Sequence, residues 1–323
     1  MCVTGGAGFI GGHLVDALFG LGATVSVIDD LSTSTAAHIA DLVDLDPERV
    51  RFVHGSILDD SALSDAMEGA GLVFHLAAMS SVPRSVAEPE RSFQVNTLGT
   101  VRVAQEAVKV GASRIVYSAS SSAYGDPPGP DEPEPKLETQ LPAPLSPYAA
   151  SKLNGEHVML AWAKTYSIST TSLRYFNIFG PRQPADSPYS AVIAVFARKL
   201  LAGEEPIVYG DGRQTRDFTY VTNAVLANLL AAASPKPLAG EVVNIGTGRA
   251  VSLLELFSLI AAGCGAPHVS PRHEPGRAGD VRHSLADVSA AAELLGYRPI
   301  ATLEEGLEAT LAWYRAAFED SRR

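Results

Sequence analysis

The sequence predicts an α/β protein, with a doubly wound parallel sheet and a smaller second α/β domain toward the C-terminus. Three features indicate this class: a strand, glycine turn, helix and strand at the start of the chain, several apolar runs of strand length, and helix-like segments between most of them. Near-continuous apolar strands are typical of a parallel sheet covered by helices on both faces. With 323 residues, the chain is long enough for two domains with substantial cores.

The first element is a βαβ unit over residues 3–32, VTGGAGFIGGHLVDALFGLGATVSVIDDLS. A short apolar strand leads through glycines into a helical pattern, and the second strand is VSVID at 25–29. Four further strands are expected at the apolar runs 71–78, 113–120, 170–177 and 241–247. The acidic, proline-rich stretch 126–138 is expected to be a loop, either on the surface or as a flap near a site.

The regular alternation of strands and helices ends after residue 177, where the turn-rich sequence FGPRQPADSP begins. We therefore expect one domain over residues 1–177 and a second over 178–323. The strand near 241–247 is expected to return to the first domain.

Composition excludes several classes of function. The formal charge of -11 disfavours a general binder of nucleic acid or anionic membranes, although a local arginine cluster could still hold a phosphate. Cys2 and Cys264 fit no CxxC or metal-ligand spacing, so no metal site is expected. No apolar run has membrane length, and we expect a cytosolic, reduced and soluble protein.

Glycines follow the first strand in a GxxGxxG pattern at Gly5, Gly8 and Gly11. Without side chains there, the backbone can turn tightly and approach a pyrophosphate at the helix N-terminus. Asp29 ends the second strand and can accept hydrogen bonds from an adenosine ribose. Asp29 and Asp30 would repel a 2′-phosphate, so the pattern favours NAD(H) over NADP(H). The alternative is that the glycines serve only to pack the helix against the strand.

The stretch LSPYAASK at 145–152 places Tyr148 four residues before Lys152. On a helix these two side chains share one face. A nearby cation would lower the pKa of the phenol and make it a usable general base. Taken alone, the pair could equally be a chance meeting on a solvated helix.

Several motifs resemble those of the extended short-chain dehydrogenase/reductases in order and spacing: TGGAGFIG, HLAA, YSASSSAYG and YAASK. The resemblance continues through LRYFNIFGP, TRDFTYV, VVNIGTG and RAGDVRHS, and so covers nearly the whole chain. Within that family the chain is most similar to NAD-dependent UDP-hexose 4-epimerases of the epimerase/dehydratase group. The resemblance implies a Rossmann-like NAD-binding domain, a small nucleotide-sugar-binding domain, NAD as cofactor, a UDP-sugar as substrate and a homodimer formed through helices.

The resemblance also implies roles for individual residues. Tyr148 would be the acid/base, and Lys152 would bind the nicotinamide ribose and, together with NAD⁺, lower the pKa of the phenol. Ser120 would share a hydrogen-bond network with the sugar O4 and the tyrosine oxygen. The implied cofactor contacts are Gly5, Gly8, Phe9, Ile10, Gly11, Asp29, Asp30, Ser32, Ser56, Ile57, Leu76, Ala77, Ala78, Asn96, Tyr148, Lys152 and Tyr175. Ser56 departs from the family pattern, because many relatives carry an aspartate there toward the adenine.

Substrate contacts are implied in the same way. Arg216, Arg277 and Asn177 would hold the diphosphate, while Asp280 would contact ribose hydroxyls or orient Arg277. For an isolated arginine a solvated surface position is the alternative, and a thymidine diphosphate sugar remains an alternative to a UDP-sugar. The full implied set is Ser81, Arg84, Ser120, Ser121, Ser122, Tyr148, Asn177, Val192, Tyr209, Arg216, Arg277, Asp280 and Ser284. Of these, Ser121 and Ser122 are either sugar contacts or only the filling of a strand end.

The reaction expected from these residues is C4 epimerisation. Dehydratases and decarboxylases of the family place acidic residues directly after the catalytic Ser/Thr, whereas this chain has SSSAYG. Abstraction of a C5 proton then lacks its usual base, which favours reversible oxidation and reduction at one carbon. A nucleotide-sugar 4-ketoreductase and a non-catalytic NAD-binding interaction protein are the alternatives.

Ser284 bears on the choice of sugar. It falls where epimerases restricted to plain hexoses often carry a bulky tyrosine, so a C2 acetamido group has room. We expect UDP-N-acetylglucosamine and UDP-N-acetylgalactosamine to be accepted and UDP-glucose and UDP-galactose to be tolerated. A uronate is the rival, since Arg84 or the serines could meet its carboxylate. Alternatively, Ser284 only caps or packs a loop.

Overall fold

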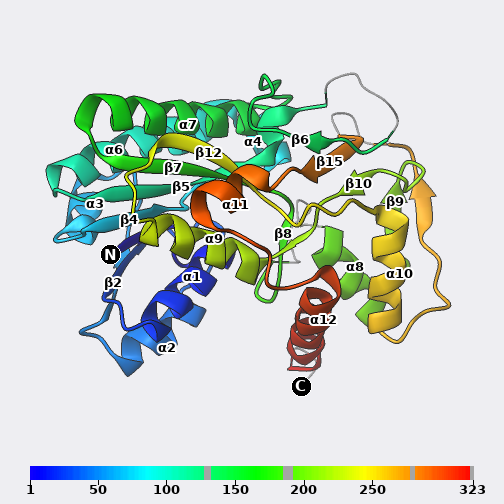
Figure 1. The fold of residues 1–323 in the computed structure, drawn as a ribbon. Helices are drawn as coiled ribbons and strands as arrows, with labels where there is room; N and C mark the ends of the chain where they lie inside the picture. The colour runs from blue at the N-terminus through cyan, green and yellow to red at the C-terminus, as the bar shows by residue number, and fades with distance from the viewer. Residues whose placement is uncertain (127–131, 185–191, 277–280, 321–323) are drawn as a thin grey trace.

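The main sheet of the computed structural model contains seven parallel strands in the order β12-β7-β5-β4-β1-β2-β3 (Figure 1), which confirms the predicted fold class. The structure describes residues 1–126, 132–184, 192–276 and 281–320. The strands are β1 (Cys2–Thr4), β2 (Val25–Asp29), β3 (Val50–His54), β4 (Leu72–His75), β5 (Arg114–Ser120), β7 (Ser169–Tyr175) and β12 (Ala239–Ile245).

Helices cover both faces of this sheet. Successive strand residues point to opposite sides, so one strand can pack against the helices of both faces. On β5, Val116 packs into one apolar cluster, while Ile115 and Tyr117 pack into another. The first cluster includes residues of α1 (Phe9–Gly20), α2 (Ala37–Leu45), α9 (Val221–Ala233) and α11 (Ser289–Leu295). The second includes residues of α3 (Asp60–Met67), α6 (Gly99–Lys109) and α7 (Pro147–Tyr166). Figure 1 shows α6 and α7 above the sheet and α1, α2 and α9 below it.

Three short helical pieces connect β4 to α6. They are α4 (Val82–Ala87), α5 (Pro89–Phe93) and a π-helical turn, η1 (Gln94–Leu98), that runs directly into α6. All three pack against α7. Such π-helical turns are frequent at functional sites, and η1 carries Asn96, one of the predicted cofactor contacts.

One strand of the sheet, β3, has no counterpart among the strands expected from the sequence. It lies at the edge of the sheet, and Arg51 and His54 are exposed on it. An edge strand needs no continuous apolar run, which is why the pattern did not indicate it. Three expected strands, 71–78, 170–177 and 241–247, end earlier than predicted, at His75, Tyr175 and Ile245.

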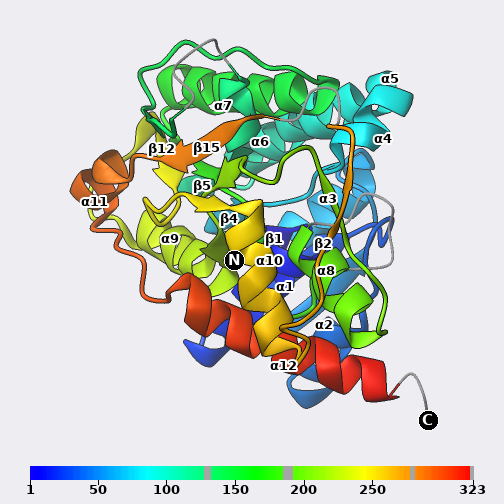
Figure 2. The same ribbon diagram turned by 90° about the vertical axis from the view of Figure 1, so that its right-hand side faces the viewer.

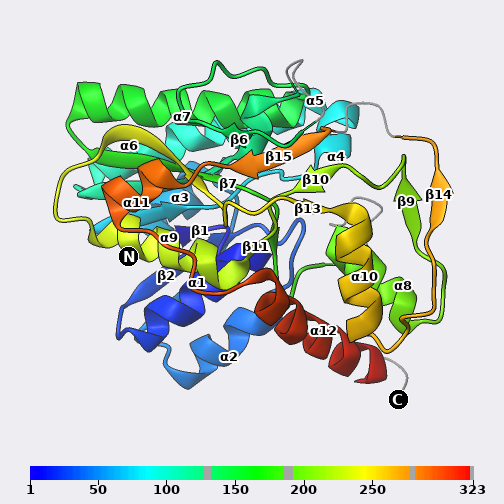
Figure 3. The same cartoon turned by 45° about the vertical axis from the view of Figure 1, so that its right-hand side comes forward.

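A second layer of structure is built mainly from the later part of the chain (Figure 2). Its four-stranded sheet has the order β13-β10-β15-β6, with β6 (Pro135–Lys136), β10 (Thr215–Arg216), β13 (Val251–Ser252) and β15 (His283–Ala286). Two strand pairs accompany it: β8 (Ile178–Phe179) with β11 (Thr219–Tyr220), and β9 (Ile207–Tyr209) with β14 (Arg272–Glu274). The helices α8 (Val192–Leu201), α10 (Leu253–Gly263) and α12 (Leu303–Asp320) lie next to one another (Figure 3). They pack around a separate apolar cluster that includes Phe196, Phe257 and Leu311.

The chain crosses between the two layers more than once. The strand expected near 241–247 is β12, which pairs with β7 in the main sheet. The helices α9 and α11 also pack on the main sheet, although both follow residue 177. Among the helices in the described ranges, none could span a lipid bilayer.

Candidate active site

The carboxyl ends of the parallel strands bring most of the predicted site residues to one edge of the main sheet. Thr4 is in register with His75, and Ser120 is in register with Tyr175. The glycine turn follows β1, and Asp29 is the last residue of β2. In open α/β sheets this edge is where ligands bind.

The glycine turn between β1 and α1 leaves no room for side chains. Gly5 has φ +72°, and a β-carbon there would lie 2.6 Å from the backbone nitrogen of Ala77. A β-carbon on Gly11 would lie 2.1 Å from the carbonyl oxygen of Gly5. Gly8 is the N-cap of α1, and no side chain caps this helix end. The first-turn N–H groups are therefore available to an anion, so the turn fits a dinucleotide pyrophosphate.

Asp29 joins this turn to the end of β2. Its carboxylate accepts hydrogen bonds from Ala7 N (3.0 Å), Leu31 N (2.9 Å) and Ser34 Oγ (3.3 Å). A carboxylate has about four acceptor positions, so capacity remains for a ribose hydroxyl. Burial raises the pKa of Asp29, and these hydrogen bonds oppose the rise.

Substitution of Gly5 by alanine tests whether the turn binds the cofactor. We expect Gly5→Ala to lose NAD affinity, because the new methyl group meets the backbone of Ala77 where the chain must turn. Gly22→Ala is the matched control, since Gly22 also has positive φ (+86°) but nothing lies within 4 Å of its β-carbon position. Gly22→Ala should lose about 1 kcal/mol of stability from backbone strain. Gly5→Ala should lose more, because its methyl group also meets the backbone of Ala77. Calorimetric NAD affinities that are equal for the two variants would contradict a role for the turn.

The other predicted cofactor residues have these places in the structure. Asp30 is exposed and accepts from Ser32 N at 3.0 Å. Ser56 Oγ accepts from Leu58 N, and the buried Ile57 side chain packs against Gly99. Phe9 and Ile10 begin α1, and Leu76, Ala77 and Ala78 follow β4.

The side chains of Asn96 and Tyr175 form hydrogen bonds with other residues of the protein. On η1, Asn96 Oδ1 accepts from Met79 N (2.8 Å), and Asn96 Nδ2 donates to Ser151 Oγ (2.9 Å). This arrangement ties the loop after β4 to α7. The Tyr175 hydroxyl accepts from Ser118 Oγ (3.1 Å) and Asn228 Nδ2 (2.6 Å). A direct contact of either residue with a cofactor stays a prediction.

Tyr148 and Lys152 lie one turn apart at the start of α7, and the helical spacing inferred from LSPYAASK is confirmed. Ser146 is the N-cap and accepts from Ala149 N at 3.1 Å, while Pro147 occupies the first turn, where its missing N–H costs nothing. The N–H of Tyr148 donates to Ser85 Oγ at 3.0 Å. Ser85, on α4, therefore fixes the backbone that carries the phenol.

The Tyr148 side chain meets Ser120 at the end of β5. Their side chains share a hydrogen bond, and Ser120 Oγ lies 2.8 Å from Ser122 Oγ. Ser120 Oγ also accepts from Ser122 N (3.2 Å) at the start of a short 3₁₀ helix, η2 (Ser121–Tyr124). The structure thus brings a phenol and a hydroxyl together, with two further serine hydroxyls, Ser121 and Ser122, next in the chain.

Burial sets the direction of two pKa values at this site. Burial raises the pKa of Tyr148, and the hydrogen bond with Ser120 opposes the rise. The expected lowering of this pKa by Lys152 together with NAD⁺ stays a prediction. Lys152 is only 3 % exposed, and its Nζ lies 4.3 Å from the centroid of the Tyr117 ring. Burial lowers the pKa of Lys152 to about 7, and the charge of Glu156 opposes this change.

Glu156, one turn beyond Lys152, forms a buried ion pair that the sequence analysis did not single out. Its two carboxylate oxygens accept from Arg174 Nε (2.8 Å) and Nη2 (2.7 Å). Both side chains are less than 5 % exposed, and the Arg174 guanidinium lies 4.6 Å from the centroid of the Tyr124 ring. The i+4 spacing of Glu156 from Lys152 is a signal that could have identified it.

Three of the predicted substrate residues converge on Asp217. The register of β10 with β15 places Arg216 beside Ser284. Asn177 Nδ2 donates to the carbonyl oxygen of Asp217 (3.3 Å), and Asp217 N donates to the carbonyl oxygen of Ser284 (2.7 Å). Arg216 Nη1 donates to the carbonyl oxygen of Thr215 at 2.8 Å. Arg277 and Asp280 lie outside the described residues.

The remaining predicted substrate residues lie on several elements. Ser81 caps α4 by accepting from Arg84 N at 3.2 Å. Arg84 itself pairs with Glu88 (3.1 Å) in a partly exposed ion pair of the kind that is worth little. Val192 begins α8, and Tyr209 ends β9.

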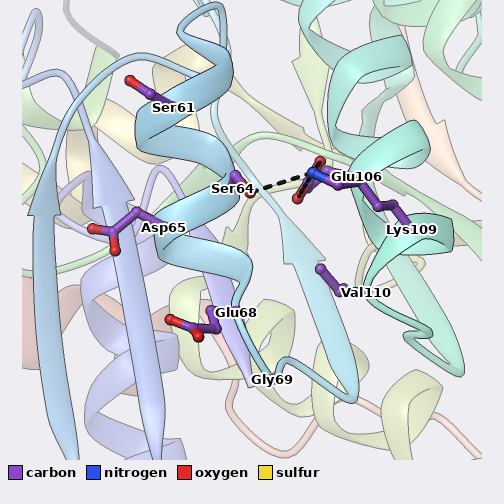
Figure 4. A pocket seen from close by; sticks show the side chains of 8 residues that line it. All are labelled: Ser61, Ser64, Asp65, Glu68, Gly69, Glu106, Lys109 and Val110. Carbon is purple, nitrogen blue, oxygen red and sulfur yellow. Dashed lines mark hydrogen bonds and ion pairs between the residues drawn. The ribbon is translucent and has the colours of Figure 1, made fainter.

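A surface depression of about 460 Å³ lies between α3 and α6, away from these residues (Figure 4). Its lining includes Glu68 and Gly69 beyond the end of α3, and Lys109 and Val110 at the end of α6. Both helices lead from there into the amino ends of β4 and β5, so the depression lies at the edge opposite Ser120. Lys109 is already bonded to Glu106 and Ser64.

Comparison with known proteins finds a family model and relatives that cover most of the chain. Residues 1–246 match the model of the NAD dependent epimerase/dehydratase family. The chain is similar to a UDP-glucose 4-epimerase of Mycolicibacterium smegmatis, with 38% identity over 97% of each chain.

Two solved structures are similar over nearly the whole chain. One is a UDP-glucose 4-epimerase of Thermotoga maritima with UDP-glucose, with a TM-score of 0.91, 37% identity and coverage of 98% of this chain and 99% of that one. The other is a UDP-N-acetylglucosamine 4-epimerase of Methanobrevibacter ruminantium in complex with UDP-N-acetylmuramic acid. Its TM-score is 0.90, with 36% identity and 98% coverage of both chains.

Proposed function

Because this chain belongs to the NAD dependent epimerase/dehydratase family, we propose that it catalyses the C4 epimerisation of a UDP-hexose through a 4-keto intermediate. NAD is the cofactor, and the glycine turn and Asp29 fit it. The observation that carries the proposal is the grouping of Ser120, Tyr148 and Lys152 at the carboxyl edge of the sheet.

The proposed mechanism assigns the proton chemistry to Tyr148. Its phenolate takes the O4 proton of the sugar as C4 is oxidised, and the phenol returns that proton when C4 is reduced from the opposite face. When bound, NAD accepts and returns the hydride at C4. Ser120 hydrogen-bonds the sugar O4 and the Tyr148 oxygen, and so keeps the two in line.

Lys152 supports this proton transfer electrostatically. Burial raises the pKa of Tyr148, so the phenolate needs a nearby positive charge. Lys152, one turn away on the same helix, is the residue proposed to provide it, and Glu156 raises the pKa of Lys152.

The diphosphate must stay bound while the 4-keto sugar turns to expose its other face. Arg216, Asn177 and, beyond the described residues, Arg277 are proposed to hold it. Binding energy placed there is remote from C4 and keeps the intermediate from leaving. A competition between UDP and dTDP for the purified protein tests the choice of base.

Cofactor balance tests the reaction class. An epimerase regenerates its cofactor, so the protein with a small amount of NAD should convert many equivalents of UDP-sugar without accumulating NADH. A 4-ketoreductase would consume NADH in proportion to product. Elimination is disfavoured because Ser121 and Ser122 follow Ser120 where a carboxylate would be needed to remove the C5 proton. Stoichiometric consumption of NADH would contradict the proposal.

Ser284 is proposed to admit a C2 acetamido group, which makes UDP-N-acetylglucosamine and UDP-N-acetylgalactosamine the favoured substrates. Ser284→Tyr should abolish turnover of the acetylated sugars and spare UDP-glucose, because the phenol ring would fill the space next to C2. Ser284→Ala is the matched control and should keep both activities. Initial rates with each sugar measure the effect, and acetylated turnover that survives Ser284→Tyr would refute the steric argument.

The protein is also proposed to form a homodimer through α6 and α7. Exposed apolar side chains lie on these helices and on the turn before α6, including Leu98 (45 %), Val108 (36 %) and Leu160 (45 %). Light scattering of the purified protein should give the mass of two chains. A single-chain mass at micromolar concentration would contradict the proposal.

A further inference from the structure

Asp217 directly follows β10, and its carboxylate is completely buried. One carboxylate oxygen, Oδ1, accepts from Thr247 N (2.8 Å) and Thr247 Oγ1 (2.7 Å). The other oxygen, Oδ2, accepts from Gly248 N (2.9 Å) and Ala286 N (3.3 Å). Burial raises the pKa of this carboxyl, and the four hydrogen bonds oppose the rise.

These donors come from the two layers of the structure. Thr247 and Gly248 follow the carboxyl end of β12 in the main sheet, while Ala286 ends β15 in the smaller sheet. Gly246 makes the approach possible, because a β-carbon there would lie 2.7 Å from Asp217 Oδ2 and 2.5 Å from the Ala286 β-carbon. The carboxylate therefore fastens the end of β12 to β15.

The backbone of the same residue holds the candidate substrate contacts. Its carbonyl oxygen accepts from Asn177, its N–H donates to the carbonyl oxygen of Ser284, and Arg216 precedes it in the chain. A shift of Asp217 would move all three together, relative to the strand ends that carry Ser120 and Tyr175.

We propose that Asp217 is a positioning residue that sets the diphosphate and sugar contacts of the smaller sheet against the main sheet. This proposal deepens the function proposed above and rests on it. The role depends on the acceptor chemistry of a carboxylate, since all four of its partners are N–H or O–H donors. An asparagine of nearly equal volume would turn one acceptor into an NH₂ donor that faces other donors.

Asp217→Asn is the test, with calorimetric UDP binding to the NAD-loaded protein as the first readout. We expect the UDP dissociation constant to rise about 10- to 100-fold, as loss of a charged hydrogen bond predicts, while NAD affinity stays unchanged. In turnover assays KM should rise more than kcat falls. Asp287→Asn is the matched control, because Asp287 directly follows Ala286, a partner of Asp217, while its own carboxylate accepts, among the described residues, from Ser289 N (2.8 Å) in a local turn.

Thr247→Val provides a second variant if Asp217→Asn does not fold. It removes the hydroxyl donor and keeps the backbone donors, and should raise the UDP dissociation constant by a smaller factor, about 5-fold. A folded Asp217→Asn with wild-type UDP affinity, or an unfolded Asp217→Asn together with an unaffected Thr247→Val, would overturn the proposal. If the wild-type protein binds UDP but does not epimerise a UDP-sugar, only the proposed reaction is contradicted. The UDP affinities of the variants would still test the positioning role of Asp217.

Discussion

Tyr148→Phe is expected to lower turnover about 10²- to 10⁴-fold, the range for loss of general acid/base catalysis, while UDP binding persists. The substitution removes one oxygen and its hydrogen bond with Ser120. The backbone of residue 148 keeps its bond to Ser85, and Ser146 still caps α7, so the helix should remain in place.

Tyr166→Phe is the matched control for this experiment. Tyr166 is the last residue of the same helix, and 51 % of it is exposed. Its variant should retain wild-type turnover and UDP affinity. Initial rates and calorimetry with the NAD-loaded protein give both quantities. Turnover near the wild-type level in Tyr148→Phe would remove Tyr148 from the mechanism.

Glu156→Gln is expected to destabilise the protein by about 3–5 kcal/mol, the cost of leaving one member of a buried ion pair without its partner. Arg174 would remain 3 % exposed and would lose a carboxylate that meets it through two hydrogen bonds. The control is Glu304→Gln, which breaks the exposed pair with Arg249 and should cost at most about 1 kcal/mol. Denaturant unfolding compares them, and equal losses for the two variants would contradict the assigned cost.

The same substitution should change the dependence of turnover on pH. The charge of Glu156 raises the pKa of Lys152, which burial has lowered to about 7. Without that carboxylate the pKa of Lys152 falls further, so the ammonium form is lost at a lower pH. The alkaline limb of the pH-rate profile of Glu156→Gln should therefore move to lower pH. An unmoved limb would show that Glu156 acts only on stability.

Local patterns predicted the parts of the fold that depend on neighbours in sequence. The glycine turn, the strands around Val116 and Val243 and the helical start at Tyr148 all carry their signal within a few residues. The edge strand β3 carries exposed Arg51 and His54, and so lacks the apolar run of a central strand.

These local patterns could not predict burial or long-range contacts. The spacing of Tyr148 and Lys152 gave their proximity, but the direction of the Tyr148 pKa depends on how the surrounding elements exclude water. The carboxylates of Asp217 and Glu156 accept hydrogen bonds from residues 18 or more positions away. A local sequence motif does not predict such long-range hydrogen bonds. Asp217 does lie next to Arg216 in the TRDF motif, and that position was its one available signal.

The most direct test of the proposed reaction is a product analysis with three substrates. The NAD-loaded protein would be incubated separately with UDP-N-acetylglucosamine, UDP-glucose and UDP-glucuronate, and the C4 epimers resolved by NMR. We predict conversion of UDP-N-acetylglucosamine to UDP-N-acetylgalactosamine, slower conversion of UDP-glucose to UDP-galactose, and no net formation of NADH. Epimerisation of the glucuronate alone would contradict the proposed sugar, and the absence of any C4 epimer would contradict the proposed reaction.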